Sequence, residues 1–324
     1  GRIMGPVESN WTRLARRRGR IFKESGYNTN ISAQVALQSL NTTSSELQAT
    51  QKRISTGYRV ADASDDGAAY AVAQRVRADV GALTSVNDQL GSAKGLVSTS
   101  MNALSKISDS VNQAQKLLVQ IGSNTTTTDQ RAQYVSSYQK IVSQVADYVD
   151  NSKYNGQSLL GSVTGGASAP LDKTVIGSET GSTKTLNKED MSTLANDLAG
   201  LIGSTFARSA TGTDTFATAT DAAAQTAAGL ALSATTGSTA FSTSLKSVAN
   251  ANNQIGSDSN MLDATISFNS SKIDSLNAGL GALIDTDLSK ESAKLQALQI
   301  KQQLGTQALS MANQAPQSLM SLFK

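Results

Sequence analysis

Side chains that could carry out chemistry are few in this sequence. Histidine and cysteine are both absent from its 324 residues. Their absence removes thiolate and imidazole metal ligands, Ser-His-Asp and Cys-His relays and the usual proton shuttle at neutral pH. Ser137 and Lys140 form the Ser-x-x-Lys pattern that is typical of penicillin-interacting serine enzymes. Because the accompanying S-D-N and K-T-G elements are missing, we interpret this pattern as chance on a helix.

Acidic residues form two other candidate sites. Asp62, Asp65 and Asp66 could ligate a hard cation, but their spacing lacks the Glu and the Gly of a calcium loop. Glu189 and Asp190 are a carboxylate pair of the kind that could act on a sugar. In both places we favour a simpler interpretation, which is negative charge at a helix N-terminus. We therefore expect no catalytic residue, no metal site and no cofactor.

Composition favours long helices over a thick aromatic core. Aromatic residues make up only 4% of the chain, so small side chains must provide much of the packing. The first 30 residues hold seven Lys and Arg against two Glu, and the total of +3 therefore leaves −2 for the remainder. We expect no nucleic-acid partner for this nearly neutral body. The sequence contains no run of eighteen apolar residues and so predicts no membrane-spanning helix.

The C-terminal segment 289–324 must bury more than one side. One apolar stripe at helical spacing contains Ala297, Ile300, Leu304, Ala308, Met311, Ala315, Leu319 and Leu322. A second stripe contains Leu295, Leu298, Leu309, Ala312, Met320 and Phe323. A helix that is apolar on two sides cannot be satisfied by lying on one surface, so it needs partners around it.

Other helical patterns could supply those partners. A heptad seam begins after Ile31 and contains Ala33, Leu37, Leu40, Ser44, Leu47, Gln51 and Ile54. Helical periodicity also runs from Val76 to Ile121 and from Phe241 to Leu283, and we expect the N- and C-terminal halves to pair antiparallel. A further helix begins near Asp129, and a turn follows it at Tyr154-Asn155-Gly156.

These patterns predict a mainly α fold: long antiparallel helical rods and coiled-coil termini with a small, partly β or irregular central insert. The expected segments are a basic extension over 1–27, an N-terminal coiled-coil segment and linker over 28–66, a first rod half over 67–160, a Ser, Thr, Gly and Ala-rich insert over 161–238, a second rod half over 239–288 and a C-terminal coiled-coil segment over 289–324. The extension reads as an expression remnant or a misassigned start, with a basic arm for a membrane surface or nucleic acid as the alternative. Within the insert we expect strands at 173–176 and 213–217, and a helix over 188–202 opened by Asn187.

Several short motifs resemble those of one family. They are Asn28-Thr29-Asn30, the stretch from Arg53 to Val60 with Ala63, Asp65, Asp66 and Ala71, the turn Tyr154-Asn155-Gly156 with Leu159-Leu160, Asp285-Thr286-Asp287, and the run from Gln302 to Leu322. Over about 28–160 and 239–324 the chain resembles the bacterial flagellins. It departs from them at Ala69, where the family has a glycine.

The resemblance implies a self-assembling structural subunit of the flagellar filament and not an enzyme. Its terminal segments would fold against each other and against neighbouring copies. It would be secreted to the cell surface without a cleaved signal peptide. Implied partners are further copies of the chain, an export chaperone at the C-terminal segment, and the filament cap and junction proteins.

We expect the assembly interface at thirteen positions: Leu37, Leu40, Leu47, Ile54, Arg59, Asp65, Asp66, Ile300, Leu304, Leu309, Met311, Leu319 and Leu322. An alternative function stays open, in which the chain is a cell-surface binding module. Its insert would then bind a polysaccharide or a host surface, or carry glycans.

Overall fold

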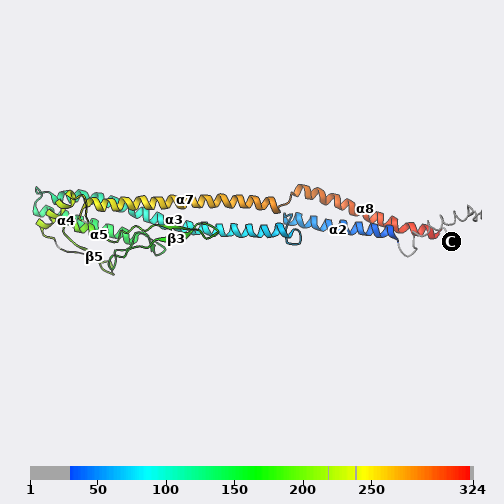
Figure 1. Ribbon diagram of the computed structural model, residues 1–324, viewed down its shortest axis with the longest axis horizontal. Coiled ribbons are helices and arrows are strands. Elements are labelled where there is room, and N and C mark those ends of the chain that lie inside the picture. The colour runs from blue at the N-terminus through cyan, green and yellow to red at the C-terminus, as the bar shows by residue number, and fades with distance from the viewer. Residues whose placement is uncertain (1–29, 218, 238, 322–324) are drawn as a thin grey trace, which may run out of the picture. The chain divides into compact units, whose positions relative to one another are not determined.

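The computed structural model describes residues 30–217, 219–237 and 239–321, with side chains up to residue 314 (Figure 1). The chain forms two compact units. We call the unit that extends to Arg75 and resumes at Ala278 the terminal unit, and Val76–Asn277 the central unit. The basic extension over 1–27 lies outside the described residues.

The central unit is built on two antiparallel helices, α3 (Gly67–Gly122) and α7 (Phe241–Ile284). The Asn87 side-chain amide donates to the Ser270 hydroxyl at 3.3 Å, and Lys94 forms an ion pair with Asp263. The apolar residues at helical spacing on α3, from Leu90 to Ile121, are buried in one core, except Met101, which is 39% exposed. The prediction of long antiparallel helices is therefore confirmed.

The next helix, α4 (Thr128–Asn151), begins with a capping box formed by Thr127 and Gln130. Arg131 is 3% exposed and fixes the turn that precedes this helix. Its guanidinium donates to the carbonyl oxygens of Ile121 at 3.0 Å and Thr126 at 2.9 Å, and it pairs with Asp221 at 3.0 Å. The buried Arg131 guanidinium thus joins the end of α3 to the start of α6 (Asp221–Ser233). The sequence pattern did not predict α6.

Three antiparallel hairpins follow α4. They are β1 (Lys153–Tyr154) with β2 (Gln157–Ser158), β3 (Lys173–Ile176) with β4 (Thr183–Leu186), and β5 (Phe206–Arg208) with β6 (Asp214–Phe216). Asn155 and Gly156 have φ of 50° and 75°, as a two-residue hairpin turn of type I′ requires. The strand expected at 173–176 is present, and the one expected at 213–217 is β6.

The helix expected over 188–202 is wrong in its first half, because α5 spans only Leu194–Gly200. Asn187 does not cap it. The backbone N–H and the side-chain amide of Asn187 instead donate to the buried carboxylate of Asp258 on α7, at 2.8 and 3.2 Å. This contact ties the segment after β4 to α7, so the helix starts later.

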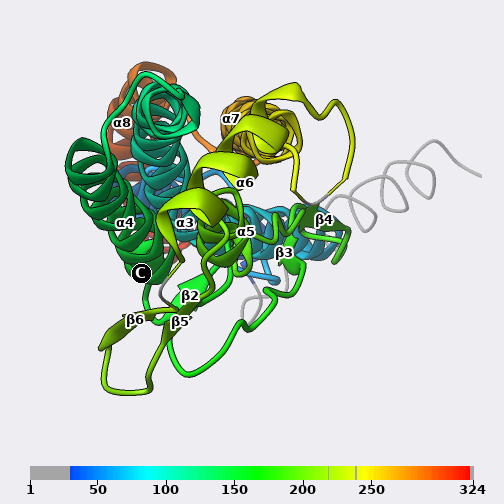
Figure 2. The ribbon, with the colours of Figure 1, turned by 90° about the vertical axis from the view of Figure 1, so that its left-hand side faces the viewer.

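The insert is part of the core of the central unit. Leu186, Leu198 and Phe206 are buried together with residues of α3, α4 and α7. Viewed along the long axis, α5 packs beside α4 and the β5–β6 hairpin (Figure 2). Removal of the insert would therefore expose core residues of the helices.

A buried ion cluster fastens the β5–β6 hairpin to α4. Arg208 is 7% exposed, and its guanidinium contacts Asp147 at 2.9 Å, Asp150 at 3.0 Å and both carboxylate oxygens of Asp214. Burial acts to raise the pKa of Asp150. Hydrogen bonds from Thr164, Ser162, Val163 and Arg208 outweigh that effect and lower the pKa to about 2.

Replacement of Tyr138 by Phe should destabilise the central unit by about 0.5–1.5 kcal/mol. The Tyr138 hydroxyl is fully buried and donates to the Leu198 carbonyl at 2.8 Å, so its removal takes one of two donors from this oxygen and leaves the Leu201 N–H at 3.1 Å as the other. Urea unfolding followed by circular dichroism measures the loss. A midpoint equal to that of the wild type would show that water or another donor replaces the hydroxyl.

Candidate assembly interface

The terminal unit is organised by a seam between α2 (Ile31–Thr56) and α8 (Leu288–Ser321). The two helices are antiparallel, since the Asn30 amide donates to the Ala312 carbonyl at 2.7 Å while Arg53 pairs with Glu291 at 3.4 Å. On α8 the covered positions are Glu291, Leu295, Leu298, Gln302, Gly305, Leu309 and Ala312. On α2 they are Ala33, Ala36, Leu40, Thr43, Leu47, Thr50 and Ile54. Both series alternate steps of three and four, which is a heptad repeat.

Two of the seven predicted seam positions on α2 are wrong. Leu40, Leu47 and Ile54 lie in it, but Leu37 is 47% exposed and Gln51 is exposed. The seam uses Ala36, Thr43 and Thr50 at these places, because small side chains let the two backbones come close. At Gly305 an added Cβ would stand 3.2 Å from a methyl carbon of Leu40.

This seam is polar for a helix pair. Thr43 and Thr50 are 2% and 1% exposed, and α8 adds the covered polar residues Glu291 and Gln302. Thr50 Oγ1 and Glu291 Oε2 are buried, and neither has a hydrogen-bond partner among the described residues. Buried polar groups without partners cost free energy, so the seam holds the two helices together only weakly.

The first of the two apolar stripes of α8 has no partner among the residues that the structure describes. Ala297, Ile300, Leu304, Ala308 and Met311 form what we call the uncovered face. Ile300, Leu304 and Met311 are 58%, 60% and 64% exposed. The two-sided helix predicted from the sequence is thus present, with one side on α2 and one side open. Leu309 belongs to the seam, the side chain of Leu319 lies outside the described ones, and Leu322 lies outside the described residues.

The base of the terminal unit closes the end of α7. Arg59 donates from its backbone N–H to the Ile284 carbonyl and from its guanidinium to the Leu283 carbonyl, both at 2.6 Å. These contacts satisfy carbonyl oxygens that the end of a helix leaves open. Val60 and Ile284 form a small core with Ala69 and Ala73, so the methyl group of Ala69 is used in packing.

The acidic residues of this region have structural roles. Asp66 caps α3 by accepting from the N–H groups of Ala68 and Ala69, and Asp287 caps α8 in the same way. Asp62 and Asp65 contact the Lys52 ammonium at 2.6 and 3.0 Å. The Lys52 ammonium therefore occupies the position that a metal ion would take if Asp62 and Asp65 were its ligands.

Acid should weaken the terminal unit through these carboxylates. Hydrogen bonds from Lys52 are the main cause that lowers the pKa of Asp62 and of Asp65 below the ordinary 3.8. Because the folded-state pKa values are depressed, the stabilisation is present above about pH 4 and is lost as the pH falls through them. Lys52→Gln should therefore flatten the loss of helicity between about pH 4 and pH 2, measured by circular dichroism. An unchanged acid profile would assign the acid response to other groups.

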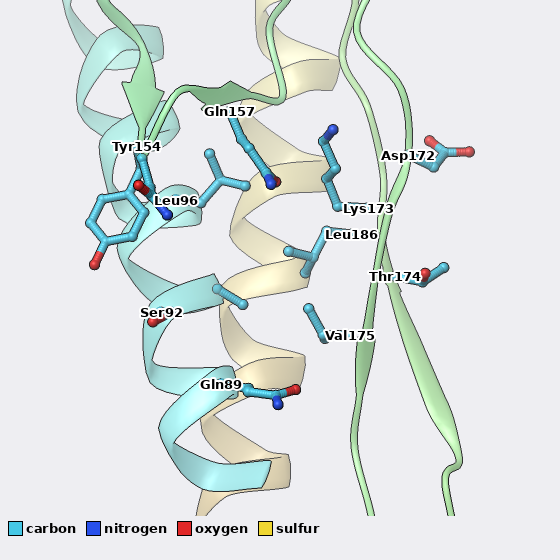
Figure 3. A pocket seen from close by; sticks show the side chains of 12 residues that line it. Gln89, Ser92, Leu96, Tyr154, Gln157, Asp172, Lys173, Thr174, Val175 and Leu186 are labelled. Atoms are coloured by element: carbon cyan, nitrogen blue, oxygen red, sulfur yellow. The ribbon is translucent and has the colours of Figure 1, made fainter. Parts of the chain in front are cut away.

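A cavity on the surface of the central unit holds no catalytic arrangement. It has a volume of about 760 Å³ and lies between α3, the β1–β2 turn and the β3–β4 hairpin. Lys173, Val175 and Leu186 point from the hairpin toward α3, while Asp172 and Thr174 point away (Figure 3). This alternation is that of a strand with one face turned inward. The lining residues provide no pair of carboxylates and no nucleophile with a base.

Paired terminal helices with an uncovered apolar face are the features of a structural protein that associates with other chains. The family of bacterial flagellins matches this chain twice. Its N-terminal helical region corresponds to residues 27–164 and its C-terminal helical region to residues 239–323. The chain belongs to the bacterial flagellins, and it is a structural subunit that polymerises into the flagellar filament.

Curated relatives agree over nearly the whole length. Flagellin FljK of Caulobacter vibrioides is 35% identical, and the match covers 92% of this chain and 98% of the relative. A flagellin of Brucella melitensis is 34% identical, with 91% and 98% covered. Flagellin C of Rhizobium meliloti is 29% identical over 91% of this chain and 98% of its own. No helix among the described residues is long and apolar enough to cross a membrane.

Proposed function

We propose that this flagellin polymerises through the uncovered face of α8. Three of its five residues are large and apolar, and each is more than half exposed in the single chain. Burial of one such side chain stabilises by about 1.5–3 kcal/mol, so a neighbouring copy that covers all three supplies a substantial driving force. The contact repeats from copy to copy without closing, which is the geometry of a helical filament.

The weak seam supports folding that is coupled to assembly. Only Thr43, Thr50, Glu291 and Leu298 are buried within it, and three of these four are polar. Fixing each backbone residue costs about 1–2 kcal/mol of conformational entropy, which so little apolar burial offsets poorly. Neighbouring copies provide the missing area, so the terminal helices become fully ordered in the filament.

The expected segments then take distinct roles. Segments 28–66 and 289–324 carry the contacts between copies, 67–160 and 239–288 form the helical body, and 161–238 faces outward. Leu37, which is exposed, joins Ile31 and Val35 as a further apolar contact on α2. Leu40, Leu47, Ile54, Arg59, Asp65, Asp66 and Leu309 act indirectly by holding the unit together, and Leu319 and Leu322 extend the α8 contact.

The remaining partners follow from the family resemblance. The chain acts without catalysis, leaves the cell without a cleaved signal peptide, and meets an export chaperone at α8 and the cap and junction proteins at the filament ends. No relative or structural feature favours the alternative of an insert that binds a polysaccharide or a host surface.

Electron microscopy of the purified protein with and without residues 289–324 tests the proposal. We expect filaments only from the full chain, because the truncated chain lacks both the uncovered face and the cover of the α2 seam. Circular dichroism should show that the truncated chain keeps the helices of the central unit. Long filaments from the truncated chain would contradict assembly through α8.

A further inference from the structure

Methionine is the most easily oxidised side chain of this protein, because the chain has no cysteine. Six methionines are present, and the structure describes the side chains of four of them. Met191 is 3% exposed, and Met261 is half-buried against the core of the central unit. Met101 is 39% exposed and Met311 is 64% exposed. Met311 is therefore the most open of these four to an oxidant in the surrounding water.

Met311 also lies on the surface that matters for assembly. It belongs to the uncovered face of α8, in line with Leu304 and Ala308. The next residue, Ala312, belongs to the seam and accepts a hydrogen bond from Asn30 at 2.7 Å. The backbone of α8 is thus held against α2 at this turn, while the Met311 side chain stays outside the seam. A flexible, polarizable thioether suits an apolar contact between chains.

We propose that Met311 is a redox-sensitive modification site that controls the entry of a subunit into the filament. The proposal rests on assembly through the uncovered face of α8, and peroxides are the class of oxidant. The thioether sulfur attacks one oxygen of hydrogen peroxide, the O–O bond breaks and an S–O bond forms. The sulfur is oxidised by two electrons. The departing hydroxyl takes up the proton of the transferred oxygen and leaves as water, so the product is methionine sulfoxide.

The sulfoxide changes Met311 from an apolar into a polar residue. In the single chain, water solvates the new S–O dipole, so α8 and its seam stay intact. In a filament contact the dipole is removed from water, and the other residues of the uncovered face, Ala297, Ile300, Leu304 and Ala308, have no side-chain donor for it. Burial of a polar group without a hydrogen bond is unfavourable, so oxidised subunits polymerise poorly. Subunits already in a filament are protected, because the contact covers the sulfur.

Treatment of the full-length monomer with hydrogen peroxide, followed by sedimentation of polymer at several protein concentrations, tests the site. Peptide mass spectrometry should find Met311 oxidised ahead of Met191 and Met261. The critical concentration for assembly should rise at least about fivefold. Reduction by methionine sulfoxide reductases of both epimer specificities should return it to the starting value. In preformed filaments the oxidation of Met311 should be slower than in the monomer.

Met311→Leu is the decisive variant, because leucine replaces methionine with little loss of packing and cannot form a sulfoxide. It should polymerise as the wild type does and keep its critical concentration after peroxide. Met101→Leu is the matched control, since Met101 is the other exposed methionine among the described side chains. It should lose assembly in peroxide to the same extent as the wild type. An equal loss from Met311→Leu would overturn the proposal, because the effect would then belong to another methionine.

Untreated Leu304→Glu separates this proposal from the assembly interface on which it rests. If fully oxidised wild type polymerises at the untreated critical concentration while Leu304→Glu does not polymerise, the uncovered face is the interface and the proposal for Met311 is wrong. If Leu304→Glu polymerises as readily as the wild type, assembly through α8 is wrong, and the proposal for Met311 is overturned with it.

Discussion

Leu304→Glu should yield a folded monomer that no longer forms filaments. Leu304 is 60% exposed on the uncovered face of α8, so a charge there is solvated in the monomer and costs little stability. In the filament the same position would be buried. The variant then loses about 1.5–3 kcal/mol of apolar burial and adds several kcal/mol for a desolvated carboxylate. The critical concentration for assembly should therefore rise by at least about 100-fold.

Gln303→Glu is the charge-matched control for this prediction. Gln303 is exposed and lies one residue earlier, about 100° round the helix and away from both the seam and the uncovered face. Sedimentation of polymer from monomer, at several protein concentrations, gives the critical concentration of both variants. If Leu304→Glu polymerised as readily as Gln303→Glu, the interface would have to lie elsewhere on the chain.

Arg208→Leu should cost the central unit about 3–5 kcal/mol. The substitution removes the only guanidinium in contact with Asp150 and Asp214 among the described residues, whose side chains are 10% and 18% exposed. Two carboxylates would remain largely buried without their cation. We expect the insert to loosen first, and hydrogen exchange followed by mass spectrometry should show lost protection in β5 and β6.

A triple variant separates lost pairing from lost packing. Arg208→Leu with Asp150→Asn and Asp214→Asn has no buried charge left at this place, so most of the stability should return. Urea midpoints of the single and the triple variant give the comparison. Should the triple variant be as unstable as the single one, packing of the Arg208 stem, and not the unpaired carboxylates, would account for the loss.

Sequence periodicity predicted the long helices well because their cores are apolar at regular spacing. The segment from Val76 to Ile121 is an example, since most of its apolar positions from Val86 onward are buried in one core. Local chemistry also located helix starts near Asp129, where Thr127 is the cap, and after Asp66. The insert was harder. Asn187 looks like an N-cap in the sequence, but a carboxylate 71 positions away on α7 takes its donors.

The interface was predicted in part for a similar reason. The two apolar stripes of α8 are visible in the sequence, and both exist in the structure over the described side chains. Whether Leu37 or Ala36 lies in the seam depends on how closely the backbone of α8 approaches α2. The close approach is visible at Gly305, where there is little room for a Cβ atom next to Leu40. A heptad pattern read from the sequence alone favours leucine at a seam position. The close packing of α2 and α8 favours the smaller alanine instead.

The hydrogen bond from Asn30 to Ala312 joins residues 282 positions apart. Synthesis on the ribosome, like any process that delivers the chain from its N-terminus, makes α2 available long before α8 is available to pair with it. Contacts of such sequence separation form late, because the whole intervening chain must be ordered or looped first. A prematurely ended chain therefore lacks the partner of α2 and the uncovered face together, and under the proposed assembly through α8 only complete subunits would enter the polymer.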